Sequence, residues 1–330
     1  MKAVLVAQPG DRPRIGIAEV PDPRPGPGEV VVDVAAADTH YPGLLVVAGR
    51  YQVRPPPPFS PGKGAAGVVS ALGTGVTGLA AGARVAVQVE YGAYAEKLRA
   101  PAVNCVPIPD DVSYAAAAAL GLVYQTAHFA LAERARLQAG ESVLVLGGSG
   151  GIGTAGIQVA KALGATPVIA AVRAAEDAAV ARAAGADAVI ETAGTVLHDR
   201  LREEVVAANG GRGVDVVIDP VGGEAGTAAL RALAWCGRAV VIGFASGEVP
   251  AIRANYLLVK NIAVLGLHWS DYRDREPARV AAAQRALFAL HQQGRLAPII
   301  TRTLPLAGFR DALCAFRDGT AQGKIILTVP

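Results

Sequence analysis

The sequence has 330 residues, of which 52% are hydrophobic and 18% are charged, and its formal net charge is +3. This length allows two domains with sizeable cores, and the composition excludes a disordered chain. The charge is small for the length and no run of lysines and arginines stands out, which argues against nucleic-acid binding.

No apolar run is long enough to predict a transmembrane helix, and the apolar N-terminus meets Gln8 and Pro9 too early for a signal peptide. Cys105, Cys236 and Cys314 lie far apart in the sequence, which suits separate thiols in a reducing compartment. We therefore predict a cytoplasmic protein that binds no membrane.

The first third of the sequence alternates short valine-rich runs with proline and glycine turns. The clearest runs are Glu29 to Val34, Gly67 to Leu72 and Arg84 to Val89. This spacing predicts a compact, partly open β-barrel with long loops. Ala115 to Leu131 then has a helical pattern, with a break expected near Gly121.

A glycine-rich segment follows the apolar run Val143 to Leu146, which has the character of a buried parallel strand. The segment matches G-x-G-x-x-G, and residues with helical spacing follow it as far as Gly164. Strand, glycine turn and helix in this order form the dinucleotide fingerprint, in which amide groups at the helix start face two phosphates. The residues expected there are Gly148, Gly150, Gly151, Ile152 and Gly153. In this motif Gly148 permits the tight turn, Gly150 lets a pyrophosphate approach, and Gly153 lets the helix pack closely.

Strands and helices alternate after the fingerprint, which predicts a parallel, doubly wound α/β sheet. The expected strands are Pro167 to Val172, Ala188 to Ile190, Val214 to Ile218, Ala239 to Ile242 and Ile262 to Leu267. The expected helices are Ala175 to Ala184, Leu197 to Ala208, Thr227 to Leu233 and Ala278 to Gln293. The tail from Ile299 to Pro330 returns to strand, short helix and strand, and we expect it to rejoin the first domain.

The end of the second strand of this sheet indicates the cofactor. NAD-binding proteins usually carry an acidic residue there for the ribose 2′-hydroxyl, but this sequence has Ala170-Ala171-Val172-Arg173. Arg173 can pair with a 2′-phosphate, so NADPH is favoured over NADH. The alternative is that Arg173 is a solvated residue at a helix start.

Metal binding is not predicted. A structural zinc site needs closely spaced cysteines, and the three cysteines here are scattered. The five histidines also lack a paired spacing that would suggest ligands.

Several short motifs spread over nearly the whole sequence are specific as a set. They are Gly49 to Val53, Pro61 to Val69, Gly75 to Gly78, Gly92 to Glu96, Ala117 to Thr126, Gly213 to Asp219, Val221 to Gly223, Gly243-Phe244 and Gly323 to Leu327. Through them the sequence resembles the medium-chain dehydrogenase/reductase superfamily, and most of all its zinc-free quinone oxidoreductases, the zeta-crystallin-like branch.

The resemblance implies a doubly wound parallel (Rossmann) sheet in residues 123–267. It implies a GroES-like, partly open β-barrel catalytic domain formed by residues 1–122 and 268–330. Zinc enzymes of the superfamily carry Gly-His-Glu after the proline that corresponds to Pro61. This sequence has Gly62-Lys63-Gly64 there, so the ligand histidine is replaced by Lys63, which we expect to be a solvated charge.

The resemblance also implies roles for individual residues. Those implied along the nicotinamide half of the cofactor are Val221, Gly243, Phe244, Ala245, Thr126 and Lys324. Tyr51 matches a tyrosine that lines the substrate cleft, where it could donate a hydrogen bond or stack on a planar substrate. Trp269 falls in a segment that resembles a lid, and it could form a substrate wall or a core or dimer contact.

Two residues depart from the pattern. His40 stands where the family often has Asn, and Thr192 where it often has a Tyr near the adenosine phosphate. His40 could donate a proton near neutral pH, or it could fill the place of Asn as a hydrogen-bonding wall. Thr192 weakens the case for NADPH without removing it.

These features favour an NADPH-dependent reductase that transfers hydride to a quinone or an α,β-unsaturated carbonyl, with a small, planar, apolar substrate. The alternatives are an enoyl thioester (acyl-CoA) reductase, which would use Arg50 and Arg54 at a basic entrance, and a non-catalytic NADPH-binding protein. The resemblance implies that the uncharged strand Ile262 to Leu267 lies at a sheet edge, where it would pair with a second copy in a homodimer. The alternative is that the helix from Ala278 or the C-terminal segment covers this edge.

Overall fold

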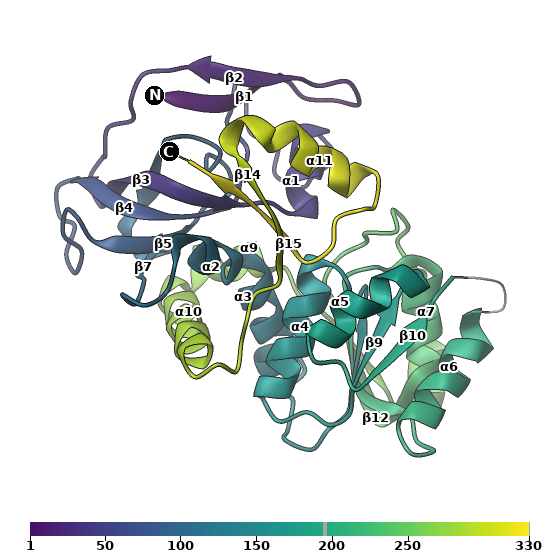
Figure 1. Ribbon diagram of the computed structural model, residues 1–330. Coiled ribbons are helices and arrows are strands. Elements are labelled where there is room, and N and C mark those ends of the chain that lie inside the picture. The colour runs from purple at the N-terminus through teal and green to yellow at the C-terminus, as the bar shows by residue number, and fades with distance from the viewer. Residues whose placement is uncertain (194–196, 330) are drawn as a thin grey trace. The chain divides into compact units, whose positions relative to one another are not determined.

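The computed structural model describes residues 1–193 and 197–329, and the chain divides into two compact units (Figure 1). The first unit comprises Met1–Leu122, Ser270–Gln292 and Ile300–Pro330. The second comprises Val123–Trp269 and Gln293–Ile299. The division expected from the sequence differs at residues 268–269 and 293–299, which it assigned to the first domain.

The first unit is built on a seven-stranded sheet of order β14-β15-β3-β4-β5-β7, with β6 paired to β3 and a separate β1–β2 pair. Its strands are β1 (Lys2–Gln8), β2 (Arg14–Glu19), β3 (Glu29–Asp38), β4 (Gly64–Leu72), β5 (Arg84–Gln88), β6 (Lys97–Pro101), β7 (Cys105–Pro107), β14 (Ile300–Pro305) and β15 (Lys324–Thr328). Its helices are α1 (Tyr41–Val47), α2 (Tyr114–Ala119), α10 (Pro277–Gln292) and α11 (Phe309–Arg317), with short turns η1 (Ala102–Asn104) and η4 (Leu306–Gly308). Valines of β3 and β5 form much of its core, as expected for β-branched side chains on a half-buried sheet.

The register between β15 and β3 joins the two ends of the sequence in this unit. The strands run antiparallel, with Ile326 opposite Asp38. Lys324 at the start of β15 is thereby brought to the end of β3, where the chain turns through His40 into α1.

The second unit is a six-stranded parallel sheet of order β10-β9-β8-β11-β12-β13, which confirms the doubly wound prediction. Its strands are β8 (Val143–Leu146), β9 (Val168–Val172), β10 (Ala188–Glu191), β11 (Val214–Asp219), β12 (Leu233–Val241) and β13 (Ala263–Gly266). Its helices are α3 (Leu122–His128), α4 (Gly151–Ala162), α5 (Ala178–Ala183), α6 (Leu197–Ala208), α7 (Gly223–Ala232) and α8 (Ala254–Lys260), with η2 (Phe129–Arg134) and η3 (Ala175–Asp177). Helix α4 packs beside α5, and α6 beside α7.

Some elements differ from expectation. The helix expected over 115–131 is split at Gly121 into α2 and α3, as predicted, and then continues as the π-helix η2. Strand β12 already begins at Leu233, where a helix was expected to end. The sequence did not predict α8 or α9 (Trp269–Arg275). No helix in the described ranges is long and apolar enough to cross a membrane.

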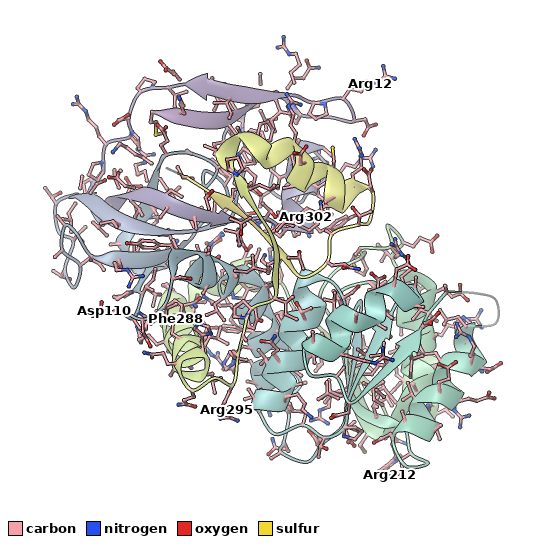
Figure 2. All side chains as sticks on the ribbon, in the orientation of Figure 1. Arg12, Asp110, Arg212, Phe288, Arg295 and Arg302 are labelled. Atoms are coloured by element: carbon pink, nitrogen blue, oxygen red, sulfur yellow. The ribbon has the colours of Figure 1, made fainter. Side chains whose placement is uncertain are left out.

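Contacts with α4 explain why residues 293–299 belong to the second unit. Arg295, labelled in Figure 2, donates to the carbonyl of Ala162 at the end of α4. The carboxamide of Gln158 donates to the carbonyl of Ala297 at 2.8 Å and accepts from its N–H at 2.9 Å. These long-range polar contacts have no signature in the local sequence.

Candidate active site

The turn between β8 and α4 depends on three glycines. The left-handed position is Gly147, with φ of +63°. Gly148 is needed for another reason, because a β-carbon there would stand 2.8 Å from Cβ of Ala170. A β-carbon on Gly153 would stand 1.9 Å from the carbonyl oxygen of Gly147, so only glycine lets α4 pack this closely.

The start of α4 has the properties of an anion site. Gly150 is its N-cap and supplies no side-chain cap, and the first N–H groups of a helix have no partner within the helix. A β-carbon on Gly150 would meet only the Gly147 carbonyl oxygen, at 3.4 Å, so packing alone does not demand glycine there. The amides of Gly151 and Ile152 and the helix dipole therefore present an open, positive end that fits a diphosphate.

Arg173 directly follows β9 and is exposed. Thr192, after the neighbouring strand β10, is fixed to β9 because its N–H and its hydroxyl both donate to the carbonyl of Val172, at 2.7 and 3.0 Å. Both residues lie at the carboxyl ends of parallel strands, the edge at which such sheets bind their ligands.

The loops after β11 and β12 are joined through Asp219. Its carboxylate accepts from the N–H groups of Val221, at 2.9 Å, and Gly222, at 2.7 Å. Burial raises the pKa of Asp219, and these two donors lower it in part. The N–H of Ala245 donates to the carbonyl of Pro220 at 3.1 Å. Val221 and the segment Gly243 to Ala245 thus belong to one hydrogen-bonded pair of loops.

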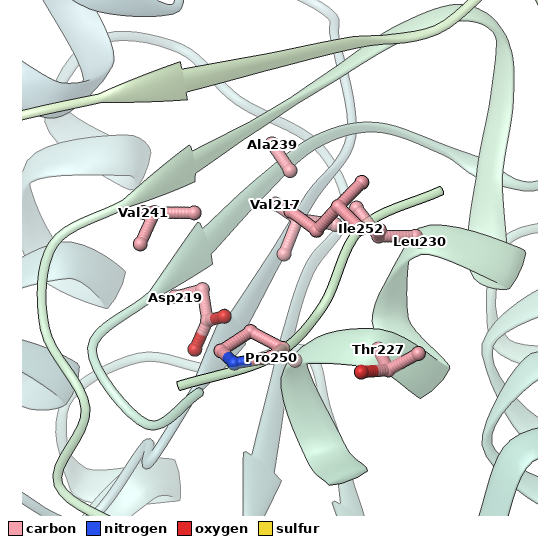
Figure 3. Close-up of a pocket in the computed structure, with 9 residues that line it drawn as sticks. Val217, Asp219, Thr227, Leu230, Ala239, Val241, Pro250 and Ile252 are labelled. Atoms are coloured by element: carbon pink, nitrogen blue, oxygen red, sulfur yellow. The ribbon is translucent and has the colours of Figure 1, made fainter. Parts of the chain in front are cut away.

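A small pocket opens below these loops (Figure 3). Its walls are mainly apolar, with the Asp219 carboxylate and the Thr227 hydroxyl as polar groups. It is lined by Val217, Asp219, Gly226, Thr227, Leu230, Ala239, Val241, Pro250 and Ile252. None of the site residues expected from the sequence lines it, so we do not assign the acceptor to this pocket.

His40 is the N-cap of α1. Its Nδ1 accepts the N–H of Gly43 at 3.1 Å. The Nδ1 of His and the side-chain oxygen of Asn occupy equivalent positions on their side chains, and either can cap a helix. This equivalence explains how His can replace Asn here, and it leaves the hydrogen of the neutral ring on Nε2.

Burial lowers the pKa of His40 to about 4. Asp38 opposes this shift, whereas Lys324 and Lys63 add to it. The ring is therefore neutral near pH 7, which favours the hydrogen-bonding role of His40 over that of a proton donor.

We expect this shift to make the protein acid-sensitive. The pKa of His40 is about 6.5 in the unfolded chain and about 4 in the folded protein, so between these pH values the unfolded chain binds more protons than the folded one. The free energy of unfolding is therefore unaffected by His40 above pH about 6.5 and decreases as the pH falls from there to about 4. Urea unfolding across this range should show a steeper loss for wild type than for His40→Asn, which keeps a cap acceptor but does not titrate. If the free energy of unfolding changes equally with pH in wild type and in His40→Asn, His40 is not the cause of the acid sensitivity.

Lys324 pairs with Asp38 inside the first unit. Its Nζ donates to Oδ2 of Asp38 and to the carbonyl of Thr39, each at 2.9 Å. The two side chains are 1% and 0% exposed. Both of these partners lie within the first unit, and the cofactor contact that the resemblance implies for Lys324 remains a proposal.

Lys63 is not the solvated charge that the sequence suggested. Its side chain is only 2% exposed and pairs with one carboxylate oxygen of Glu90. Arg273 of α9, which is 5% exposed, binds the other oxygen at 3.0 Å. Burial lowers the pKa of Lys63, and Glu90 raises it in part. Glu90 therefore bridges two buried cations.

Tyr51 lies against this ion-pair network. The Nζ of Lys63 is 4.5 Å from the centre of its ring, a cation–π contact, and its hydroxyl is hydrogen-bonded to Ser270. Burial raises the pKa of Tyr51 to about 12. The phenol therefore stays protonated and can donate a hydrogen bond.

Two expected site residues belong to the second unit. Trp269 is buried, and its indole nitrogen has no hydrogen-bond partner among the described residues. Thr126 is buried on α3. Tyr51 and His40 belong to the first unit.

Three charged residues that reasoning from the sequence missed are central to the first unit, namely Asp38, Glu90 and Arg273. Asp38 ends β3 and Glu90 follows β5 by two residues, so a carboxylate after an apolar run was the available signal. In the described ranges no three His, Cys, Asp or Glu side chains are grouped as a possible metal site.

Two family models match the sequence. Residues 26–110 match the alcohol dehydrogenase GroES-like domain, and residues 151–297 match the zinc-binding dehydrogenase model. Quinone oxidoreductase-like protein 2 of Mus musculus is 36% identical over 308 residues, covering 93% of this chain and 87% of the relative. The chain belongs to the quinone oxidoreductase-like family. This family lies in the medium-chain dehydrogenase/reductase superfamily, so the resemblance and the expected fold class, Rossmann sheet plus GroES-like domain, are confirmed.

Two solved structures extend the comparison. A quinone oxidoreductase of Escherichia coli complexed with NADPH has a TM-score of 0.89 and 28% identity, covering 99% of this chain and 100% of its own. A mycobacterial protein complexed with NADPH has a TM-score of 0.89 and 30% identity, covering 99% of each chain. Both structures therefore align with nearly the whole length of this chain.

Proposed function

We propose that the protein is a cytoplasmic, NADPH-dependent reductase that transfers hydride to a quinone or an α,β-unsaturated carbonyl compound without a metal ion. The observation that carries this proposal is the glycine turn at the start of α4, in a chain whose solved relatives include NADPH complexes. When bound, the cofactor supplies hydride from C4 of its nicotinamide. The protein's part is to hold cofactor and acceptor in reacting geometry.

The proposed cofactor contacts follow the second unit. The amides of Gly151 to Gly153 would hold the diphosphate, and Arg173 would bind the 2′-phosphate. The residues proposed along the nicotinamide half are Val221, Gly243, Phe244, Ala245, Thr126 and Lys324. Backbone hydrogen bonds join the loops after β11 and β12, which supports Val221 and Gly243 to Ala245 as one rigid wall.

The acceptor is proposed to contact Tyr51, His40 and Trp269. Without a metal, negative charge on the acceptor oxygen must be met by side chains, amides or water. The protonated phenol of Tyr51 is the group best suited to donate, and the Lys63 cation against its ring adds to its polarity. His40 enters the proposal as a neutral ring that borders the acceptor and not as an acid.

The two alternatives have weaker support. An enoyl thioester reductase would use Arg50 and Arg54 for the CoA phosphates, but Arg50 pairs with Asp11 at the surface and Arg54 is exposed. These two arginines therefore do not form a preorganised basic site for the CoA phosphates. A non-catalytic NADPH-binding protein would share the second unit but would not oxidise the cofactor.

The test is NADPH oxidation, followed by absorbance, with matched panels of simple quinones, enones and enoyl thioesters. We expect turnover with a quinone or an enone, and unchanged turnover after treatment with a chelator. Preference for the thioesters would favour the first alternative, and tight NADPH binding without turnover would favour the second. Loss of activity on chelation, with stoichiometric zinc in the purified protein, would overturn the metal-free mechanism.

Arg173→Ala should weaken NADPH binding about ten- to a hundredfold and leave NADH binding nearly unchanged. A charge-assisted contact of this kind is worth about 1.5–3 kcal/mol. Titration calorimetry with both cofactors measures the change. Arg212→Ala is the matched control, because Arg212 is exposed and precedes β11 instead of following β9. If wild type does not prefer NADPH to NADH, or if Arg173→Ala keeps the full preference, Arg173 does not select the cofactor.

We also propose a homodimer through β13. This strand is at the edge of the sheet, and its residues are partly or fully exposed although they are apolar. The adjacent helix α8 exposes Leu258 and Val259, which are 78% and 77% exposed. The N–H of Leu267 donates inward to Val241, and because inward and outward amides alternate, the amide of Val264 points to the free edge.

Val264→Pro should therefore convert the dimer to a monomer, because it removes an outward donor from the paired strands. Val264→Thr, which keeps the amide, is the control and should remain dimeric. Light scattering on both variants, with circular dichroism to verify folding, distinguishes them. A monomeric wild type, or a folded proline variant that stays dimeric, would exclude this interface.

A further inference from the structure

A group of buried polar atoms in the first unit has no hydrogen-bond partner among the described residues. The atoms are Oδ1 of Asp38, Nε2 of His40, both carboxamide atoms of Gln88 and the hydroxyl of Tyr94. All four side chains are nearly inaccessible to solvent, the most exposed being Gln88 at 4%. Buried groups of this kind are unfavourable unless something satisfies them, and ordered water is the usual partner.

These atoms face a common space. A β-carbon on Gly64 would stand 3.2 Å from Oδ1 of Asp38 and 3.1 Å from both carboxamide atoms of Gln88. Nε2 of His40 is 3.7 Å from the same Oδ1, which is too long for a direct hydrogen bond. A β-carbon on Gly43 would stand 3.4 Å from the His40 ring and 3.8 Å from the Tyr94 hydroxyl. Tyr94 therefore borders the space on the His40 side.

The charges around this space decide what it can hold. The ammonium of Lys324 already neutralises Asp38 through Oδ2, so a second cation would be uncompensated. An anion would lie against the Asp38 carboxylate. The atoms left open include acceptors, on Asp38 and Gln88, and donors, on His40, Tyr94 and Gln88. The complement is a small neutral molecule that both donates and accepts.

We propose that this space binds an internal water molecule, which accepts a hydrogen bond from His40 and donates one to Asp38. Gln88 or Tyr94 supplies a third contact, the usual number for a buried water. His40 is then held at both nitrogens, by the Gly43 amide at Nδ1 and by the water at Nε2. Its one ring hydrogen points into the protein, so His40 acts as a positioning residue for the start of α1.

A high-resolution crystal structure of the whole protein tests the site directly. We expect a water peak within hydrogen-bond distance of Oδ1 of Asp38, of Nε2 of His40 and of one atom of Gln88 or Tyr94. Direct pairing of these side chains, an empty space, or an ion with metal-ligand distances would each overturn the proposal.

Nuclear magnetic resonance on the protein with ¹⁵N-labelled histidine gives a test in solution. The Nε2–H of His40 should be visible and should give a cross-peak to water. Gly64→Ala, whose new methyl group crowds the space, should lose it, and Gly16→Ala, where a β-carbon meets nothing within 4 Å, should keep it. If Gly64→Ala does not fold, Gln88→Leu removes two partners of the water and should also lose the cross-peak. If wild type lacks the cross-peak, or if a folded Gly64→Ala or Gln88→Leu variant keeps it, no water molecule is bound in this space.

Discussion

Lys324→Met should lower the free energy of unfolding by about 3–5 kcal/mol, and Asp38→Asn should have an effect of similar size. Each change leaves the other charge buried without its partner, and breaking a buried pair has this magnitude. The double variant should recover most of the loss, because no uncompensated charge remains. Urea unfolding of the four proteins completes the double-mutant cycle and gives the coupling energy between the two residues.

Lys161→Met is the matched control for this cycle. Lys161 also pairs with an aspartate at 2.8 Å, but both side chains are 39% exposed, so its loss should be at most about 1 kcal/mol. Single variants at Lys324 and Asp38 that lose no more than this control would contradict the account. So would a double variant whose loss equals the sum of the two single losses.

Glu90→Gln should produce the second large effect, about 3 kcal/mol or more. The substitution keeps the side-chain shape but removes the carboxylate that both Lys63 and Arg273 use, which leaves the buried Lys63 without an ion-pair partner and Arg273 with Asp274 alone. Adding Lys63→Met should restore part of the stability, because one of the two cations is then gone. Thermal and urea unfolding measure both steps.

Glu276→Gln serves as the comparison, since Glu276 pairs with Arg279 at the exposed start of α10 and its loss should be small. If Glu90→Gln matches this surface variant, the buried network does not stabilise the first unit. If Lys63→Met lowers the stability of Glu90→Gln further, repulsion between the two cations is not the cause of the loss.

The elements that position the cofactor were predictable from local patterns. The strand Val143–Leu146 and the glycines that follow it are set by steric requirements within a few residues, so the sequence contains the whole signal. One detail was not predicted, namely that the left-handed residue of the turn is Gly147, which precedes the motif. A motif fixes the spacing of the glycines but not which dihedral angle each one adopts.

The charged network of the first unit was not predictable in this way. Lys63 was interpreted as solvated because lysine usually is, and its partner Glu90 is brought to it by the pairing of β4 with β5. The pairing of Lys324 with Asp38 was also not expected, because the two residues are 286 positions apart in the sequence. Local periodicity contains no information on contacts at such separations. The acceptor-binding roles of Tyr51, His40 and Trp269 and the dimer remain predictions.

The position of β15 has a consequence for the order in which the polypeptide is synthesised. A ribosome delivers every strand of the second unit before the last strand of the first, because β15 must add to β3 after the whole α/β segment has emerged. Until then Asp38 has no counter-ion and the edge of β3 that β15 covers is open. Folding on the ribosome therefore completes the middle of the chain first, and the nascent N-terminal strands need protection from aggregation for nearly the entire time of translation.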